Sequence, residues 1–136
     1  MSASQIQHPV GGVLASAISN GVVRLLREYT GRGPTRARTH ISDDLINVVL
    51  EDTLTKGEQS LVNDGETALV LSARNAYQRT MRTDLVILVE ELTGRKVRAF
   101  LSSNHLEPDI AIESFVLEPE LETSPTGNGL HAVGTA

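Results

Sequence analysis

The apolar residues of this chain switch between two spacings, and the order of the switches limits the fold. Steps of three and four indicate an amphipathic helix, whereas strict alternation indicates a strand with one buried face. The helical spacing occurs over Gly11–Tyr29 and over about Glu66–Thr93. Alternation follows each helix, over Thr35–Ile41 with Leu45–Glu51 and over Val97–Ser102 with Ile110–Leu117. The sequence therefore predicts an α+β fold, a two-layer αββαββ domain whose four-stranded, mainly antiparallel sheet has two long helices on one face.

Turn and cap residues separate these elements. Gly31-Arg32-Gly33-Pro34 should end the first helix, because Gly tolerates a left-handed helix end and Pro lacks a backbone donor. Ser42-Asp43-Asp44 is the expected turn of the first hairpin, and Gly94 the expected end of the long helix. Thr55 and Glu58 have the spacing of a capping box, which predicts that a short helix begins there.

Each long helix carries an apolar stripe that should pack on the sheet. In the first helix the stripe is Leu14, Ile18, Val22, Leu25, Leu26 and Tyr29. In the long helix it is Leu69, Ala73, Ala76, Tyr77, Met81, Leu85, Leu88 and Leu92. At a rise of ~1.5 Å per residue the long helix would span about 40 Å. A four-stranded sheet of this size needs less, so we expect part of this helix to project toward a partner.

The length of 136 residues suits one domain with a continuous core. We expect residues 11–118 to form that single domain. Residues 1–10 are predicted to be a flexible N-terminus. Residues 119–136 are rich in Pro, Gly, Ser, Thr and acids, which predicts a disordered acidic tail.

The sheet face away from the helices should also carry apolar side chains. If Ile46, Val48 and Leu50 face the helices, then Leu45 and Val49 point the other way. The last two predicted strands also have apolar residues at both odd and even positions, so some of these side chains must point away from the helices. Because such a face is poorly suited to water, we expect a homodimer, formed through this face or by exchange of a hairpin or the long helix.

Composition excludes several classes of protein. The chain has no cysteine, which rules out disulfides, thiolate metal sites and cysteine nucleophiles, and fits a reducing compartment. No apolar run approaches the ~20 residues of a membrane span, and Met1–Pro9 lacks the pattern of a secretory signal. We therefore expect a cytoplasmic protein without membrane insertion.

Basic residues gather on one predicted strand. Arg36, Arg38 and His40 alternate there, Arg32 precedes them, and Arg98 could lie nearby. These five side chains are the candidate docking or anion-binding site. The alternative is a solvated face whose arginines pair with acids such as Asp43, Asp44 and Glu51. Nucleic acid is a less favoured ligand, because aromatic residues make up 3% of the chain and its net charge is −5.

No motif for catalysis, metal or cofactor is found. Gly31-Arg32-Gly33-Pro34 follows a helix and precedes a strand, the reverse of a dinucleotide loop, and Arg36 stands where that loop needs Gly. The histidines lack the short spacings of a zinc site; they are His8, His40, His105 and His131. The acids show no pair with contrasting environments. The sequence predicts no catalytic, cofactor-binding or metal-binding residue, and a protein that is not an enzyme.

The order of these residues resembles the MpsC-like domain family, over about Ser19–Leu117. The segments that carry the resemblance are Glu28-Tyr29-Thr30-Gly31-Arg32-Gly33-Pro34, Leu54-Thr55 with Glu58, Val89-Glu90-Glu91-Leu92-Thr93-Gly94-Arg95-Lys96-Val97 and Phe115-Val116-Leu117. The resemblance implies a small bacterial cytoplasmic protein, linked to a membrane system that translocates sodium, generates membrane potential or takes up inorganic carbon. It brings no catalytic residues with it.

Two functional hypotheses follow. The first is an accessory or regulatory homodimer that docks on a subunit of that membrane system, at the inner face of the membrane. The alternative is a module that binds an anionic ligand or nucleic acid through the Arg-rich strand face.

Overall fold

The computed structural model describes residues 7–120, which form seven elements in two layers. The helices are α1 (Gly11–Thr30), α2 (Lys56–Asn63) and α3 (Thr67–Thr93). The strands are β1 (Arg36–Ser42), β2 (Leu45–Glu51), β3 (Val97–His105) and β4 (Ile110–Leu117). All strand pairs are antiparallel, and the sheet order is β1-β2-β4-β3. The predicted α+β fold and its two helix-plus-hairpin units are confirmed.

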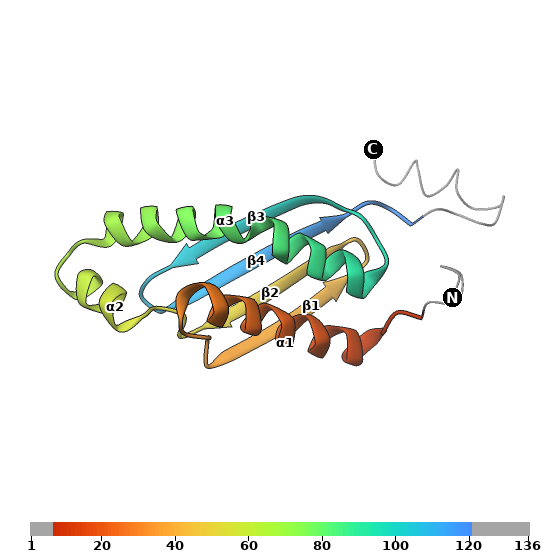
Figure 1. The fold of residues 1–136 in the computed structure, drawn as a ribbon, viewed down its shortest axis with the longest axis horizontal. Coiled ribbons are helices and arrows are strands. Elements are labelled where there is room, and N and C mark those ends of the chain that lie inside the picture. The colour runs from red at the N-terminus through yellow and green to blue at the C-terminus, as the bar shows by residue number, and fades with distance from the viewer. Residues whose placement is uncertain (1–6, 121–136) are drawn as a thin grey trace.

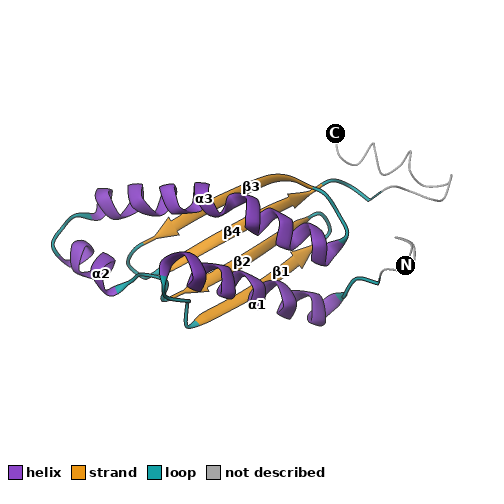
Figure 2. Cartoon of the chain, viewed as in Figure 1, coloured by secondary structure: helices purple, strands orange, loops and turns teal. Residues whose placement is uncertain are grey.

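The two long helices lie side by side on one face of the sheet (Figures 1 and 2). Helix α1 lies over β1 and α3 over β3, so each helix follows an edge strand. The core between the layers is aliphatic, with one aromatic pair, Phe100 and Phe115, whose ring centroids are 5.1 Å apart. Ile46, Val48 and Leu50 point into this core, as the alternation predicts.

The apolar stripe of α1 is confirmed except at its end. Ile18, Val22, Leu25 and Leu26 are buried. Tyr29 is 38% exposed, and its hydroxyl donates a hydrogen bond of 2.6 Å to Asp84 on α3. This residue therefore joins the two helices at the surface.

The predicted stripe of α3 is wrong in its first half. Leu69 and Tyr77 are 53% and 46% exposed, whereas Val70 and Arg74 are buried. From Met81 onward the buried positions are Met81, Leu85 and Val89. The predicted stripe included only apolar residues, so it left out Arg74. This arginine is buried because its polar partners also lie inside the fold.

Helix α3 is longer than the strands it covers. Its first turns pack on α2, where Leu54, Val62 and Val70 form a small second core beside Leu106. At ~1.5 Å per helical residue and ~3.3 Å per strand residue, α3 is about 10 Å longer than the longest strand. Helix α2 packs against that excess length, and a contact of this end with a partner stays a prediction.

The predicted caps are confirmed. Gly31 and Gly94 end α1 and α3 in the left-handed conformation, with φ of 78° and 70°. Thr55 accepts a hydrogen bond from the backbone of Glu58, and the Glu58 side chain accepts one from the backbone of Thr55. Asp43 supplies the positive φ of 50° in the first hairpin turn.

Two strands end later than predicted. Strand β3 continues through His105 because its backbone stays in register with β4 up to Ile110. Strand β1 ends one residue later than expected, at Ser42, which pairs with Leu45. Of the predicted N-terminal and C-terminal segments, residues 1–6 and 121–136 lie outside the described residues.

The contact between α1 and α3 makes a testable prediction at Gly21. A Cβ at this buried glycine would lie 2.6 Å from Leu88 Cδ1 on α3. We expect Gly21→Val to lower the free energy of unfolding by about 2 kcal/mol through overpacking, measured by urea denaturation. Gly12→Val is the control, since nothing lies within 4 Å of a Cβ there. Equal stability of the two variants would contradict this contact.

Candidate functional site

One face of the sheet is left uncovered by the helices among the described residues, and it carries both apolar and basic side chains. We call it the open face. Its rows run across β1, β2, β4 and β3 in register: Arg36, Glu51, Ile110 and His105; Arg38, Val49, Ile112 and Ser103; His40, Asn47, Ser114 and Leu101; Ser42, Leu45, Val116 and Ala99. The exposed fractions are 39% for Leu45, 37% for Ile112 and 55% for Leu101. The predicted outward positions of Leu45 and Val49 are confirmed.

The structure brings only some of the predicted basic residues together. Arg36, Arg38 and His40 lie on the β1 side of the open face. Arg36 forms an ion pair of 3.8 Å with Glu51 on the neighbouring strand. Arg32 lies before the strand, where its guanidinium binds both the carbonyl and the carboxylate of Asp52. Within residues 7–120, Arg38 and His40 form no ion pair and no side-chain hydrogen bond, so they are the part of the cluster that remains available.

Arg98 does not belong to this cluster. It lies on β3, the opposite edge of the sheet, with β2 and β4 between it and β1. It borders α3 near Arg82 and Val86. The expectation that Arg98 lies near Arg36 and Arg38 is wrong, because a sequence does not show that the two hairpins place β1 and β3 at opposite edges.

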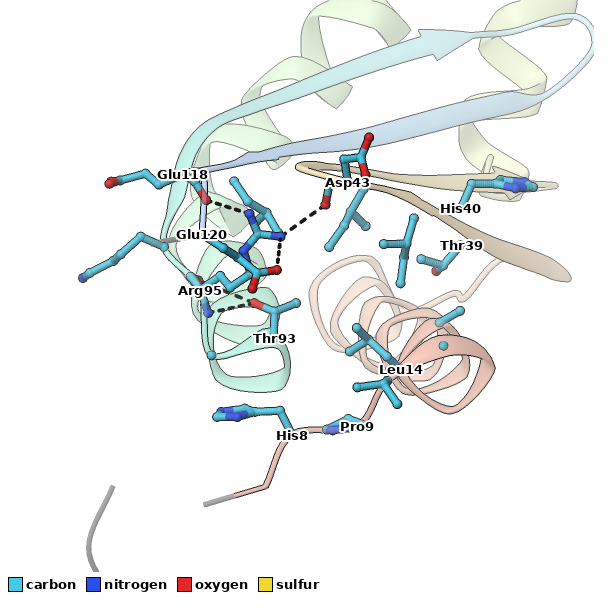
Figure 3. A pocket seen from close by; sticks show the side chains of 18 of the residues that line it. His8, Pro9, Leu14, Thr39, His40, Asp43, Thr93, Arg95, Glu118 and Glu120 are labelled. Carbon is cyan, nitrogen blue, oxygen red and sulfur yellow. Dashed lines mark hydrogen bonds and ion pairs between the residues drawn. The ribbon is translucent and has the colours of Figure 1, made fainter. Parts of the chain in front are cut away.

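A pocket of about 1130 Å³ opens where α1 begins and α3 ends (Figure 3). Its apolar wall includes Leu14, Ile46 and Leu117. The segment before α1 crosses the end of α3, where a Cβ on Gly94 would lie 2.7 Å from the ring of His8. The pocket therefore lies among the segment before α1, the first hairpin turn, the end of α3 and the residues just after β4.

Arg95 lines this pocket, and its guanidinium is already bound by neighbouring carbonyl and carboxylate groups. Its guanidinium donates to the carbonyls of Asp43 and Glu118, binds the Asp44 carboxylate, and lies 3.7 Å from a carboxylate oxygen of Glu120. These contacts tie the first hairpin turn to the chain after β4. Arg95 is thus held by structural contacts, whereas Lys96 and His40, which also line the pocket, form no ion pair within residues 7–120.

A buried polar network lies at the other end of the domain, and the sequence analysis did not find it. Arg74 on α3 is 8% exposed, and its guanidinium donates to Thr53 at 2.7 Å, Glu58 at 3.2 Å and Asn104 at 3.0 Å. Thr53 in turn donates to Asp109 at 2.9 Å. The network joins both loops at this end of the sheet to α2 and α3. The one sequence feature that could have indicated the network is the spacing of Arg74, which follows Val70 by four residues and so lies on the same, buried side of α3.

Glu113 is the one fully buried carboxyl among the described residues, at 1% exposure on the helix-facing side of β4. Ser102 on β3 donates a hydrogen bond to it. Burial raises the pKa of Glu113 to about 7, although the Ser102 hydrogen bond and the charge of Arg74 act in the opposite direction. The alternation of β4 places residue 113 beside Ala111 and Phe115, so its inward position could have been inferred from the sequence.

The groups needed for a metal or an acid–base site are not gathered in the part of the chain that the structure describes. Residues 7–120 contain no group of three or more His, Cys, Asp or Glu side chains that could hold a metal ion. Among the same residues, no helix is long and apolar enough to span a membrane.

Fold and surface together define a two-layer α+β domain with one helix-covered and one open sheet face. The chain belongs to the MpsC family, since residues 11–119 match the family described as "Na+-translocating membrane potential-generating system (MpsC)". It is 29% identical over 90 residues to the uncharacterized protein YbcI of Bacillus subtilis (strain 168), which covers 65% of this chain and 73% of YbcI. No solved structure matches it.

The buried network predicts a large cost for removing Arg74. Arg74→Met should lower the free energy of unfolding by about 3 kcal/mol, because Glu58 loses its cationic partner inside the fold and Thr53 and Asn104 each lose a hydrogen bond. Arg79→Met, on the exposed side of the same helix, should change it by less than about 0.5 kcal/mol. Urea denaturation measures both, and equal effects would show that the network contributes nothing.

Glu113 predicts a pH dependence of stability. Its folded pKa of about 7 exceeds the ordinary value of 4.5, so between these pH values the folded state binds more protons than the unfolded state. The free energy of unfolding should therefore fall as pH rises from about 4.5 to 7, by on the order of 2–3 kcal/mol. Glu113→Gln should remove this decline. A decline of the same size in the variant would assign it to other groups.

Proposed function

We propose that this protein is a non-enzymatic accessory or regulatory component of a membrane system that translocates ions and generates membrane potential, for cation or inorganic-carbon uptake. In this proposal the chain acts in the cytoplasm, at the inner face of the membrane, by binding a protein subunit of that system. The family description names a Na+-translocating, membrane-potential-generating system, and the observation that carries the proposed mode of action is the open face.

The open face has the composition of a protein-binding surface. Its centre is formed by partly exposed aliphatic side chains, chiefly Val49, Ile112 and Val116. Burying such area contributes about 25 cal/mol per Å². The unpaired Arg38 and His40 flank this centre on β1 and add a directional, electrostatic contribution. The expected partner surface is therefore an apolar patch bordered by acidic side chains.

The alternative of an anionic ligand or nucleic acid is less favoured by the same geometry. Arg32 and Arg36 are paired with Asp52 and Glu51, and Arg98 lies at the far edge of the sheet. Only Arg38 and His40 remain for an anion, and no Phe, Tyr or Trp side chain lies on the open face of the described strands to stack a base. The predicted homodimer stays a prediction, and a second copy is a competing occupant of this face.

Charge reversal at Arg38 tests the proposal. Tagged protein is recovered from gently solubilised membranes of the native host, and co-purifying proteins are identified by mass spectrometry. We expect a subunit of an ion-translocating system with the wild type, and about tenfold lower recovery with Arg38→Glu, equivalent to about 1.4 kcal/mol. Arg36→Glu should have a smaller effect, because that arginine is already paired with Glu51.

The control is Arg24→Glu, an equal charge change on an exposed residue of α1 in the helix layer. It should leave recovery unchanged. Equal recovery with Arg38→Glu, or a dimer without any transport subunit, would contradict the proposal.

A further inference from the structure

We propose that the outer edge of β3, together with the neighbouring flank of α3, binds an extended acidic segment of a partner protein, which adds as a fifth strand to the sheet. This surface is distinct from the open face and goes beyond the function proposed above. The inference rests on three features of this edge: its free backbone, two hollows along it, and the charges above it.

The edge of β3 is available for strand addition. Among residues 7–120 the sheet ends at β3, so the outward backbone groups of this strand have no strand partner. After the irregularity between Val97 and Ala99, the strand stays in register with β4 through His105. The segment from Ala99 to Asn104 contains no charge and no proline, the devices by which natural edge strands avoid pairing. The opposite edge, β1, carries Arg36, Arg38 and His40 instead.

Two hollows follow one another along this edge, between β3 and α3. The first, of about 210 Å³, is lined by Arg82, Val86, Ala99 and Phe100 among others. The second, of about 270 Å³, is lined by Gln78, Arg79, Arg82, Phe100 and Ser102, with Asn75. Arg82 and Phe100 border both hollows. The side chains of an added strand that point toward the helix layer would enter this depression.

The charges around the hollows are positive and unpaired. Arg79, Arg82 and Arg98 are exposed, and within residues 7–120 none of them forms an ion pair. The two acids that contact residues lining the hollows each accept a hydrogen bond already, Glu90 from the backbone of Val97 at 2.8 Å and the buried Glu113 from Ser102. Acidic side chains on the added strand would complement these arginines.

The same charges disfavour a second copy of the chain. Pairing of β3 with β3 around a two-fold axis would place the α3 flanks of both copies against each other. Arg79 and Arg82 of each copy would then meet like charges. The observed segment suits a partner strand of about six residues, about 20 Å long, with acidic residues at alternate positions.

Peptide display tests the inference. A library of random twelve-residue peptides is selected on the wild-type protein and, in parallel, on Arg79→Glu/Arg82→Glu. We expect the wild type to enrich sequences with acids at alternate positions and no proline, and the selected peptide to bind the double variant at least tenfold more weakly. Arg38→Glu, on the open face, should bind that peptide like the wild type, which separates this site from the surface proposed above.

Hydrogen exchange locates the bound peptide. We expect slower exchange at Ala99–Asn104 when the selected peptide is added, and no change in β1. The inference is overturned if no acidic sequence is enriched, if the double variant binds the peptide equally well, or if Ala99–Asn104 exchange is already slowed in the free protein in a concentration-dependent way, which would identify a second copy as the occupant.

Discussion

Two helices can cover only one face of a four-stranded sheet, and most features of this domain follow from that limit. The helix-covered face holds the aliphatic core, with Ile46, Val48 and Phe115 fully buried. Because side chains alternate along a strand, the other face must carry the intervening residues, which include Val49, Ile112 and Val116. Stability therefore depends on one face of the sheet, and binding is assigned to the surfaces that the helices leave free.

The two ends of the domain are held by arginines in different ways. At one end Arg74 is buried and joins α2, α3 and both nearby loops in a hydrogen-bonded network. At the other end Arg95 joins the first hairpin turn to the chain after β4. Both guanidinium groups are therefore bound by groups of the domain itself. Arg38, Arg79 and Arg82 make no ion pair in the described chain, so the proposals for binding rest on them.

Local signals in the sequence predicted the elements well and the functional surfaces only in part. The caps at Gly31, Gly94 and Thr55 depend on neighbouring residues, so they could be predicted from the sequence. The inward position of Arg74 and the distance of Arg98 from β1 depend on strand order and on partners far along the chain. Charge patterning located the basic strand, but only tertiary contacts show which arginines are already paired.

If a partner covers the open face in the cell, as we propose, a thiol placed on that face will react more slowly there than in the purified protein. The chain has no cysteine, so Val49→Cys introduces a single thiol at the centre of that face, and Ser16→Cys introduces one on exposed α1. Maleimide labelling is compared between purified protein and native membranes. We expect Val49→Cys to be labelled more slowly in membranes than in purified protein, and Ser16→Cys to be labelled at the same rate in both. Equal labelling of Val49→Cys in both preparations would contradict it.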